Sequence, residues 1–123
     1  MGKERDARAR LLAERQAAVH RLAGLDREFA DIVEAAGSAN ADDEHDPEGA
    51  TIAFERQHLA ALLGQARDQL SRLDAALERV DDGSYGLCVQ CGRPIGTARL
   101  AARPAADTCI TCAAQKHGFR RAR

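Results

Sequence analysis

Two stretches of this sequence repeat apolar residues at alternating spacings of four and three, and no other feature constrains the fold as tightly. Seven of the eight stripe positions are apolar in the first stretch, and eight of nine in the second. A stripe sustained over about four heptads is typical of a coiled coil. The positions are Leu11, Arg15, Ala18, Leu22, Leu25, Phe29, Ile32 and Ala36, then Ile52, Arg56, Leu59, Leu63, Ala66, Leu70, Leu73, Leu77 and Val80. We interpret the two interrupting arginines as side chains whose charged ends reach solvent.

The flanking residues predict where the two helices begin and end. The first helix is expected over residues 3–36, with Gly37 just past its end. The second begins at Asp46-Pro47-Glu48, where Asp serves as N-cap and Pro occupies the first helical position. It ends at Asp81-Asp82-Gly83-Ser84. The connection of about 9–14 residues permits an antiparallel hairpin.

Composition agrees with an all-α fold. Of the 123 residues, 26 are Ala, only 23 are Leu, Ile, Val or Phe, and none is Trp. So few large side chains cannot fill a thick core, which excludes a β-sandwich, a barrel or a doubly wound enzyme. No window of about 18 residues lacks charges, so no transmembrane helix is expected. The charged first residues predict no secretory signal and a cytoplasmic location.

Charge is distributed unevenly along the chain. The net charge is −1, yet residues 28–55 hold nine acidic residues and no Lys or Arg. This split suggests two surfaces with different partners. Five acids fall within residues 42–48; Asp46 and Glu48 could simply favour the start of the second helix. We expect Asp42 and Asp43 to be exposed, and we regard a cation site at this tip as less favoured.

Four cysteines predict a metal centre. Cys88, Cys91, Cys109 and Cys112 form the pattern C-x2-C-x17-C-x2-C, which fits a structural zinc ion. Gly92 could adopt the positive φ that the first cysteine turn requires. Two disulfides or a redox pair are the alternatives, but the absence of a signal and of a βαβ pattern disfavours them. Four thiolates leave no open position for a substrate, so the ion is expected to be structural.

Three arginines, Arg93, Arg99 and Arg103, lie between the cysteine pairs. They could stabilise the negative zinc–thiolate cluster by donating to sulfur, or they could form a basic contact surface. The sequence contains no nucleophile–base pair and no phosphate-binding Gly loop, and we predict no enzymatic activity.

These features together predict two domains. Residues 1–82 form the antiparallel coiled-coil hairpin with an acidic tip near residues 38–51. Residues 83–123 form a small C4 zinc-finger head with a short C-terminal helix and a basic tail. A hairpin that closes its own seam is expected to be a monomer.

The segments around the cysteines, GSYGLCVQCG at 83–92 and RLAARPAADTCITC at 99–112, resemble the DksA/TraR C4-type zinc-finger proteins. The resemblance covers roughly residues 40–115. It implies a bacterial transcription regulator that binds RNA polymerase directly and not promoter DNA. The hairpin would enter the secondary channel, its tip would approach the catalytic Mg²⁺, and the zinc module would hold the rim. Such proteins often act together with guanosine tetraphosphate.

The chain departs from the family pattern in two places. The family tip reads Asp-x-x-Asp-x-Ala-Thr; here Asp46 and Ala50 align with it one residue short, and Asp43 with Asp46 restores the spacing alone. The expected polymerase-facing tip is Asp42, Asp43, Asp46 and Ala50. The family's basic alarmone positions correspond to Gln65, Arg72 and Ala113. Only Arg72 is basic, so it is the candidate alarmone or rim contact, and we predict weak or absent alarmone cooperation.

Two other functions remain open at this point. A zinc-finger DNA binder would use Arg93, Arg99, Arg103 and the basic tail, and its affinity would fall steeply with salt. The chain lacks the Cys2His2 pattern, and DNA would repel its acidic segment. A redox sensor would instead lose zinc when the cysteines are oxidised, and this role is compatible with polymerase binding.

Overall fold

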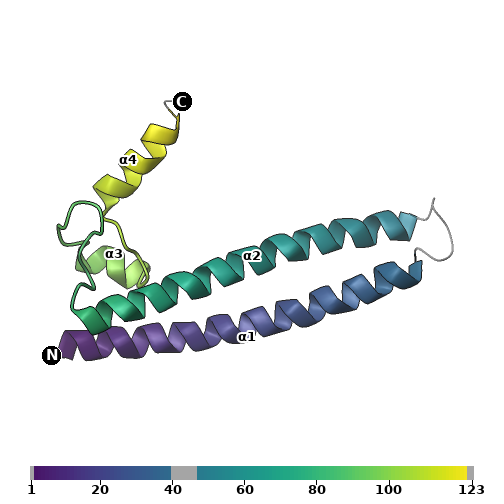
Figure 1. The fold of residues 1–123 in the computed structure, drawn as a ribbon, viewed down its shortest axis with the longest axis horizontal. Helices are drawn as coiled ribbons and strands as arrows, with labels where there is room; N and C mark the ends of the chain where they lie inside the picture. Colours follow the sequence, from purple (N-terminus) through teal and green to yellow (C-terminus); the bar gives the residue numbers. More distant parts are fainter. Residues whose placement is uncertain (1, 40–46, 122–123) are drawn as a thin grey trace. The chain divides into compact units, whose positions relative to one another are not determined.

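The fold is all-α, as predicted. The computed structural model describes the backbone of residues 2–39 and 47–121. These residues form four helices: α1 (Gly2–Ala39), α2 (Pro47–Asp82), α3 (Thr97–Ala102) and α4 (Ile110–Arg121) (Figure 1). The described ranges contain no β-strand. An isolated antiparallel β-bridge joins Leu87 and Pro94. None of the helices in these ranges is both long and apolar enough to cross a membrane.

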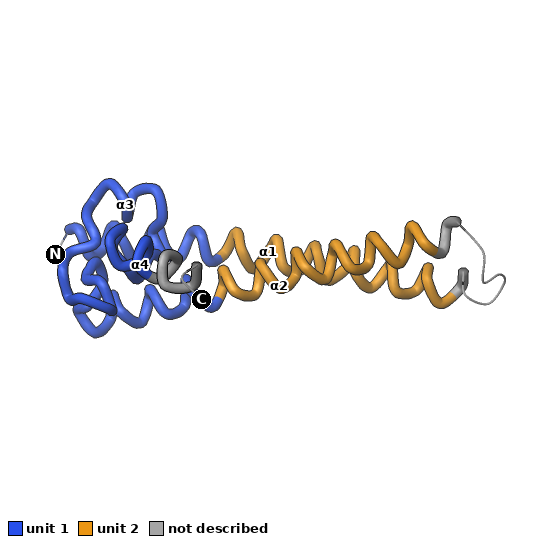
Figure 2. Tube along the Cα trace, turned by 90° about the horizontal axis from the view of Figure 1, so that it is seen from above, with its two compact units in different colours: residues 1–15, 71–123 blue, residues 16–70 orange. Residues whose placement is uncertain are grey.

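The chain groups into two compact units, coloured separately in Figure 2. Unit 1 comprises Met1–Arg15 and Ser71–Arg123, and unit 2 comprises Gln16–Leu70. Each unit contains a piece of α1 that runs antiparallel to a piece of α2. The predicted division into a hairpin of residues 1–82 and a head of residues 83–123 stays a prediction.

In unit 2 the heptad stripes form the contact between the two helices. On α2, Leu59, Leu63 and Ala66 are buried. The stripe positions of α1 from Ala18 to Ala36 are all half-buried, whereas most residues beside them are exposed. An ion pair between Arg67 Nη2 and Asp26 Oδ1, at 3.4 Å, links the two helices outside the seam. The contact between the two helices in unit 2 is therefore only partly shielded from water, because most seam residues of α1 keep part of their surface exposed.

In unit 1 the same seam is tighter. Leu11 and Leu73 are fully buried, and Ala76 and Val80 lie beside them in the core. Arg15, whose charged end is predicted to reach solvent, is 40% exposed and also pairs with Asp74 on the facing helix, with 2.5 Å between Nε and Oδ1. The stripe position therefore carries a specific interhelical contact. Arg56, the other interruption, is exposed as expected.

The ends of the long helices agree with the sequence at three of the four boundaries. Gly37 lies inside α1, which continues to Ala39. A helical glycine costs only about 1 kcal/mol relative to alanine, so it does not by itself stop a helix. The helix α2 begins at Pro47 as predicted. After its last residue, Ser84 donates to Asp82 through its hydroxyl and its backbone N–H, and these bonds lower the pKa of the Asp82 carboxyl.

Candidate metal centre

The first cysteine pair lies in a tight turn. The bridge between Leu87 and Pro94 closes the turn, and Cys88 N–H donates to the Arg93 carbonyl at 2.8 Å. Gly92 N–H donates to the Cys88 carbonyl at 2.9 Å, with Gly92 at a φ of 78°. This left-handed conformation confirms the prediction for Gly92 and explains why glycine directly follows the second cysteine.

The second cysteine pair lies at the start of α4. Cys109 immediately precedes the helix and Cys112 occupies its first turn. Ala113 N–H donates to the Cys109 carbonyl at 2.9 Å, and Cys112 N–H points at the Cys109 sulfur at 3.4 Å. The partial positive charge of a helix N-terminus stabilises a thiolate in this position.

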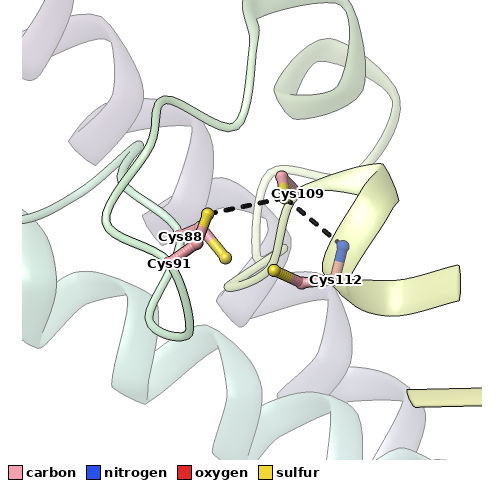
Figure 3. A group of neighbouring side chains, drawn as sticks. All are labelled: Cys88, Cys91, Cys109 and Cys112. Atoms are coloured by element: carbon pink, nitrogen blue, oxygen red, sulfur yellow. Dashed lines mark hydrogen bonds between the residues drawn. The ribbon is translucent and has the colours of Figure 1, made fainter. Parts of the chain in front are cut away.

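The two pairs converge on one point, as Figure 3 shows. All four Sγ atoms lie within 4.8 Å of one another, and the Cys91 and Cys109 sulfurs are 3.8 Å apart. Four sulfurs at about 2.3 Å from a tetrahedral zinc ion are separated by about 3.8 Å. A disulfide would need about 2.05 Å, and all four cysteines are free. The donor set therefore fits one tetrahedral zinc ion with four thiolate ligands.

The thiols differ in acidity because they share hydrogen bonds. Burial raises the pKa of Cys88, but backbone hydrogen bonds from Cys109, Cys91 and Gln90 outweigh it and bring the pKa to about 6. A backbone hydrogen bond from Cys112 lowers the pKa of Cys109. The side-chain hydrogen bond to Cys109 raises the pKa of Cys112 to about 12. Zinc must therefore displace protons that the cluster otherwise holds.

The segment before Cys109 is held in place by backbone contacts. Arg99 Nε donates to the Thr108 carbonyl at 2.8 Å, and Val89 N–H donates to the Asp107 carbonyl at 2.9 Å. Arg99 thus contacts the backbone beside a zinc ligand, whereas one of its two sequence predictions is a hydrogen bond to sulfur. Arg93 and Arg103 are exposed, which leaves the contact-surface interpretation open for them.

Further contacts within unit 1 hold the zinc segment together and join it to the two long helices. The Tyr85 hydroxyl donates to the Pro104 carbonyl at 2.8 Å. Arg10 donates to the carbonyls of Leu100, at 3.5 Å, and Ala101, and Arg79 Nη2 donates to the Ala105 carbonyl at 3.5 Å. No sequence pattern predicted these contacts. The run of helix-favouring residues in Thr97–Ala102 was a usable signal for α3, but nothing in the sequence paired Arg10 with that helix.

The residues predicted for the tip and for the alarmone or rim contact do not form a cluster in the described part of the chain. Asp42, Asp43 and Asp46 lie outside the described residues. Ala50 is exposed in the first turn of α2, and Arg72 is exposed farther along the same helix.

The fold and the site define a C4 zinc-finger protein built on two long antiparallel helices. The sequence model described as "Prokaryotic dksA/traR C4-type zinc finger" matches residues 83–116. The structure of transcription factor DksA2 from Pseudomonas aeruginosa matches with a TM-score of 0.80 and 30% sequence identity, covering 98% of this chain and 88% of that chain. The chain belongs to the DksA/TraR C4-type zinc-finger family, and its cofactor is one structural zinc ion.

Curated relatives share the C-terminal part most strongly. RNA polymerase-binding transcription factor DksA from Caulobacter vibrioides (strain NA1000 / CB15N) is 51% identical over 57 residues, which are 46% of this chain and 39% of the relative. The protein of the same name from Escherichia coli (strain K12) is 44% identical over 46 residues, 37% of this chain and 30% of the relative. The matches thus span well under half the length of these curated relatives.

Proposed function

We propose that this protein is a transcription regulator that binds bacterial RNA polymerase and inserts the acidic connection between α1 and α2 into the secondary channel, where it modulates initiation. The observation that carries the proposal is the match to DksA2 along 98% of the chain, together with the four-cysteine centre. The curated relatives are named for polymerase binding, which favours this function over the DNA-binding alternative. Such a regulator would work in the cytoplasm, as a monomer.

The distribution of charge supports the proposal. Unit 2 contains four Lys and Arg against eleven Asp and Glu, whereas unit 1 contains fourteen against eight. In unit 2, the acids Glu28, Asp31, Glu34 and Glu55 are all exposed. An acidic segment of this kind is repelled by nucleic acid and attracted to a basic surface or a bound cation. The acids Asp42, Asp43 and Asp46, with Ala50, are the proposed active tip.

The zinc centre has a structural role in this proposal. It ties the segments around Cys88 and Cys109 together, and the contacts of Arg10 and Arg79 tie the zinc segment to α1 and α2 within unit 1. We propose that this unit contacts the outer rim of the channel. Arg72, exposed on α2 in the same unit, is the candidate rim contact.

The experiment separates binding from activity at the tip. Purified core RNA polymerase is used to capture the wild type and the triple variant Asp42→Asn, Asp43→Asn, Asp46→Asn, and both are assayed in transcription initiation. We expect the triple variant to retain binding and to lose its effect on initiation. The matched control neutralises three exposed acids of α1, Glu28→Gln, Asp31→Asn and Glu34→Gln, and should keep the effect.

Two results would contradict the proposal. The first is that wild-type protein fails to bind core polymerase. The second is that a photo-crosslinker at residue 43 or 46 reacts only with the outer surface of the polymerase and not near its active site. Adding guanosine tetraphosphate to the same assays tests the weak alarmone cooperation expected from Gln65 and Ala113; strong synergy would show that expectation to be wrong.

A further inference from the structure

Phe54 on α2 is a large apolar side chain that the fold leaves outside the core. Its side chain is 72% exposed, more than any other large hydrophobic residue in the described part of the chain. The whole sequence has three Phe, one Tyr and no Trp. One of only four aromatic residues therefore lies in water, although burial of a phenyl ring is among the most favourable contributions that a side chain can make.

The helical register explains why α1 does not cover Phe54. The seam of α2 passes through Ile52 and Leu59, and Ile52 is half-buried while Leu59 is buried. Phe54 follows Ile52 by two residues, a rotation of about 200° around an α-helix. The ring therefore projects from the side of α2 opposite the seam, and its exposure follows from its position in the heptad.

The exposed neighbours of Phe54 include one small residue on its own helix face and an acid beside it in the sequence. Ala50 and His58, at i−4 and i+4, share this face of the helix and are exposed. Glu55, the next residue in the sequence, is exposed, and no Lys or Arg occurs from residue 28 to residue 55. Arg56 is the first basic residue after this acidic stretch. The small Ala50 leaves space beside the ring for a partner, and the acidic stretch that ends at Glu55 complements a basic border around it.

We propose that Phe54 is an anchor of the polymerase-binding surface, inserting its ring into an apolar socket of RNA polymerase that is bordered by Lys and Arg side chains. This inference rests on the proposed function and adds a contact separate from the tip acids. Aromatic residues are over-represented among the few side chains that carry most of an interface's binding energy. Charge complementarity around such an anchor selects the partner and speeds association.

The test measures the affinity of the full chain for core RNA polymerase. We expect Phe54→Gln to weaken binding at least tenfold, and Phe54→Leu, which keeps an apolar side chain, to lose less. The matched control is Val19→Gln, which replaces a 39% exposed apolar residue of α1 in the same unit but outside the acidic stretch. It should stay within twofold of the wild type.

The outcomes distinguish the two proposals. If the wild type binds polymerase and Phe54→Gln binds equally well, the anchor is wrong while the proposed function stands. If the wild type does not bind, the proposed function fails and the anchor fails with it. Sedimentation velocity of the free protein tests whether a second copy of this chain covers Phe54. Self-association that Phe54→Gln abolishes would identify the second copy as the partner of this ring and overturn the proposal. Circular dichroism should show the same helix content in all variants.

Discussion

The Tyr85 hydroxyl donates a 2.8 Å hydrogen bond to the carbonyl of Pro104, nineteen residues later in the sequence. Pro104 is buried and Tyr85 is half-buried, so the bond satisfies a carbonyl that has little access to water. This pair connects the end of α2 to the loop that leads to the second cysteine pair, and both residues belong to unit 1.

The environment of Tyr85 predicts a pH dependence. Burial raises the pKa of the Tyr85 phenol above its ordinary value of 10.0, outweighing the nearby Arg10 and Arg79. Because the folded state favours the neutral phenol, this stabilisation is complete below pH 10 and disappears as pH rises through the folded pKa. Tyr85 is the only tyrosine and Trp is absent, so alkaline ultraviolet titration reports it alone. A midpoint at or below 10.0 in the zinc-loaded protein would contradict this prediction.

Zinc removal should unfold the segment that carries the cysteines. We expect elemental analysis to find one zinc ion per chain, and we expect Cys112→Ser to lose it, because three thiolates bind zinc much more weakly than four. Chelation of the wild type should lower the helix signal in circular dichroism, since α3 and α4 depend on the metal segment. Thr111→Ser, next to the same ligand, is the control and should retain one zinc. Full zinc occupancy in Cys112→Ser would rule out the four-cysteine site.

Substitution by alanine is expected to have opposite effects at Gly64 and Gly92. Gly64 is helical, and an added Cβ would meet nothing within 4 Å, so Gly64→Ala should raise the free energy of unfolding by about 0.5 to 1 kcal/mol. Gly92 also has open space around it, but its φ is 78°. A side chain there costs about 1 to 2 kcal/mol, so Gly92→Ala should weaken zinc binding roughly five- to thirty-fold. Urea unfolding and chelator competition measure the two effects, and equal signs would refute the conformational argument.

The Arg15–Asp74 pair should contribute modestly to stability. Its side chains are 40% and 48% exposed, so water screens the attraction and we expect a coupling energy of about 0.2 to 1 kcal/mol. A double-mutant cycle with Arg15→Gln and Asp74→Asn, followed by thermal unfolding at low and high salt, isolates that energy. The coupling should shrink as salt rises. A coupling that salt leaves unchanged would show that packing, and not charge, explains why arginine occupies this stripe position.

The long helices and the metal ligands were readable from the sequence because both follow local rules. Leu59, Leu63, Ala66, Leu73 and Val80 all lie in the core where the 4-3 stripe predicts them. The spacing of the four cysteines likewise predicted a cluster that the structure brings within 4.8 Å. Periodicity and ligand spacing need no knowledge of distant neighbours.

The contacts that the sequence did not reveal depend on which residues the fold brings together. Arg15 interrupts the apolar stripe in the sequence, and only the folded chain brings Asp74 within reach of it. Arg99 donates to the Thr108 carbonyl. The sequence alone does not tell whether this arginine contacts a backbone carbonyl or a cysteine sulfur. Gly37 lies inside the helix because a single helical glycine costs only about 1 kcal/mol. The tip residues Asp42, Asp43 and Asp46 lie outside the described ranges, and their role stays a prediction.

Arg10 donates to carbonyls that lie ninety and ninety-one residues farther along the chain. During synthesis on the ribosome, this arginine must wait until α3 has emerged before its partners exist, and the first fifteen residues can complete their compact unit only after the later segments are made. In unit 2, by contrast, the paired segments emerge one directly after the other. The two ends of the same pair of helices are thus expected to assemble at different times during translation.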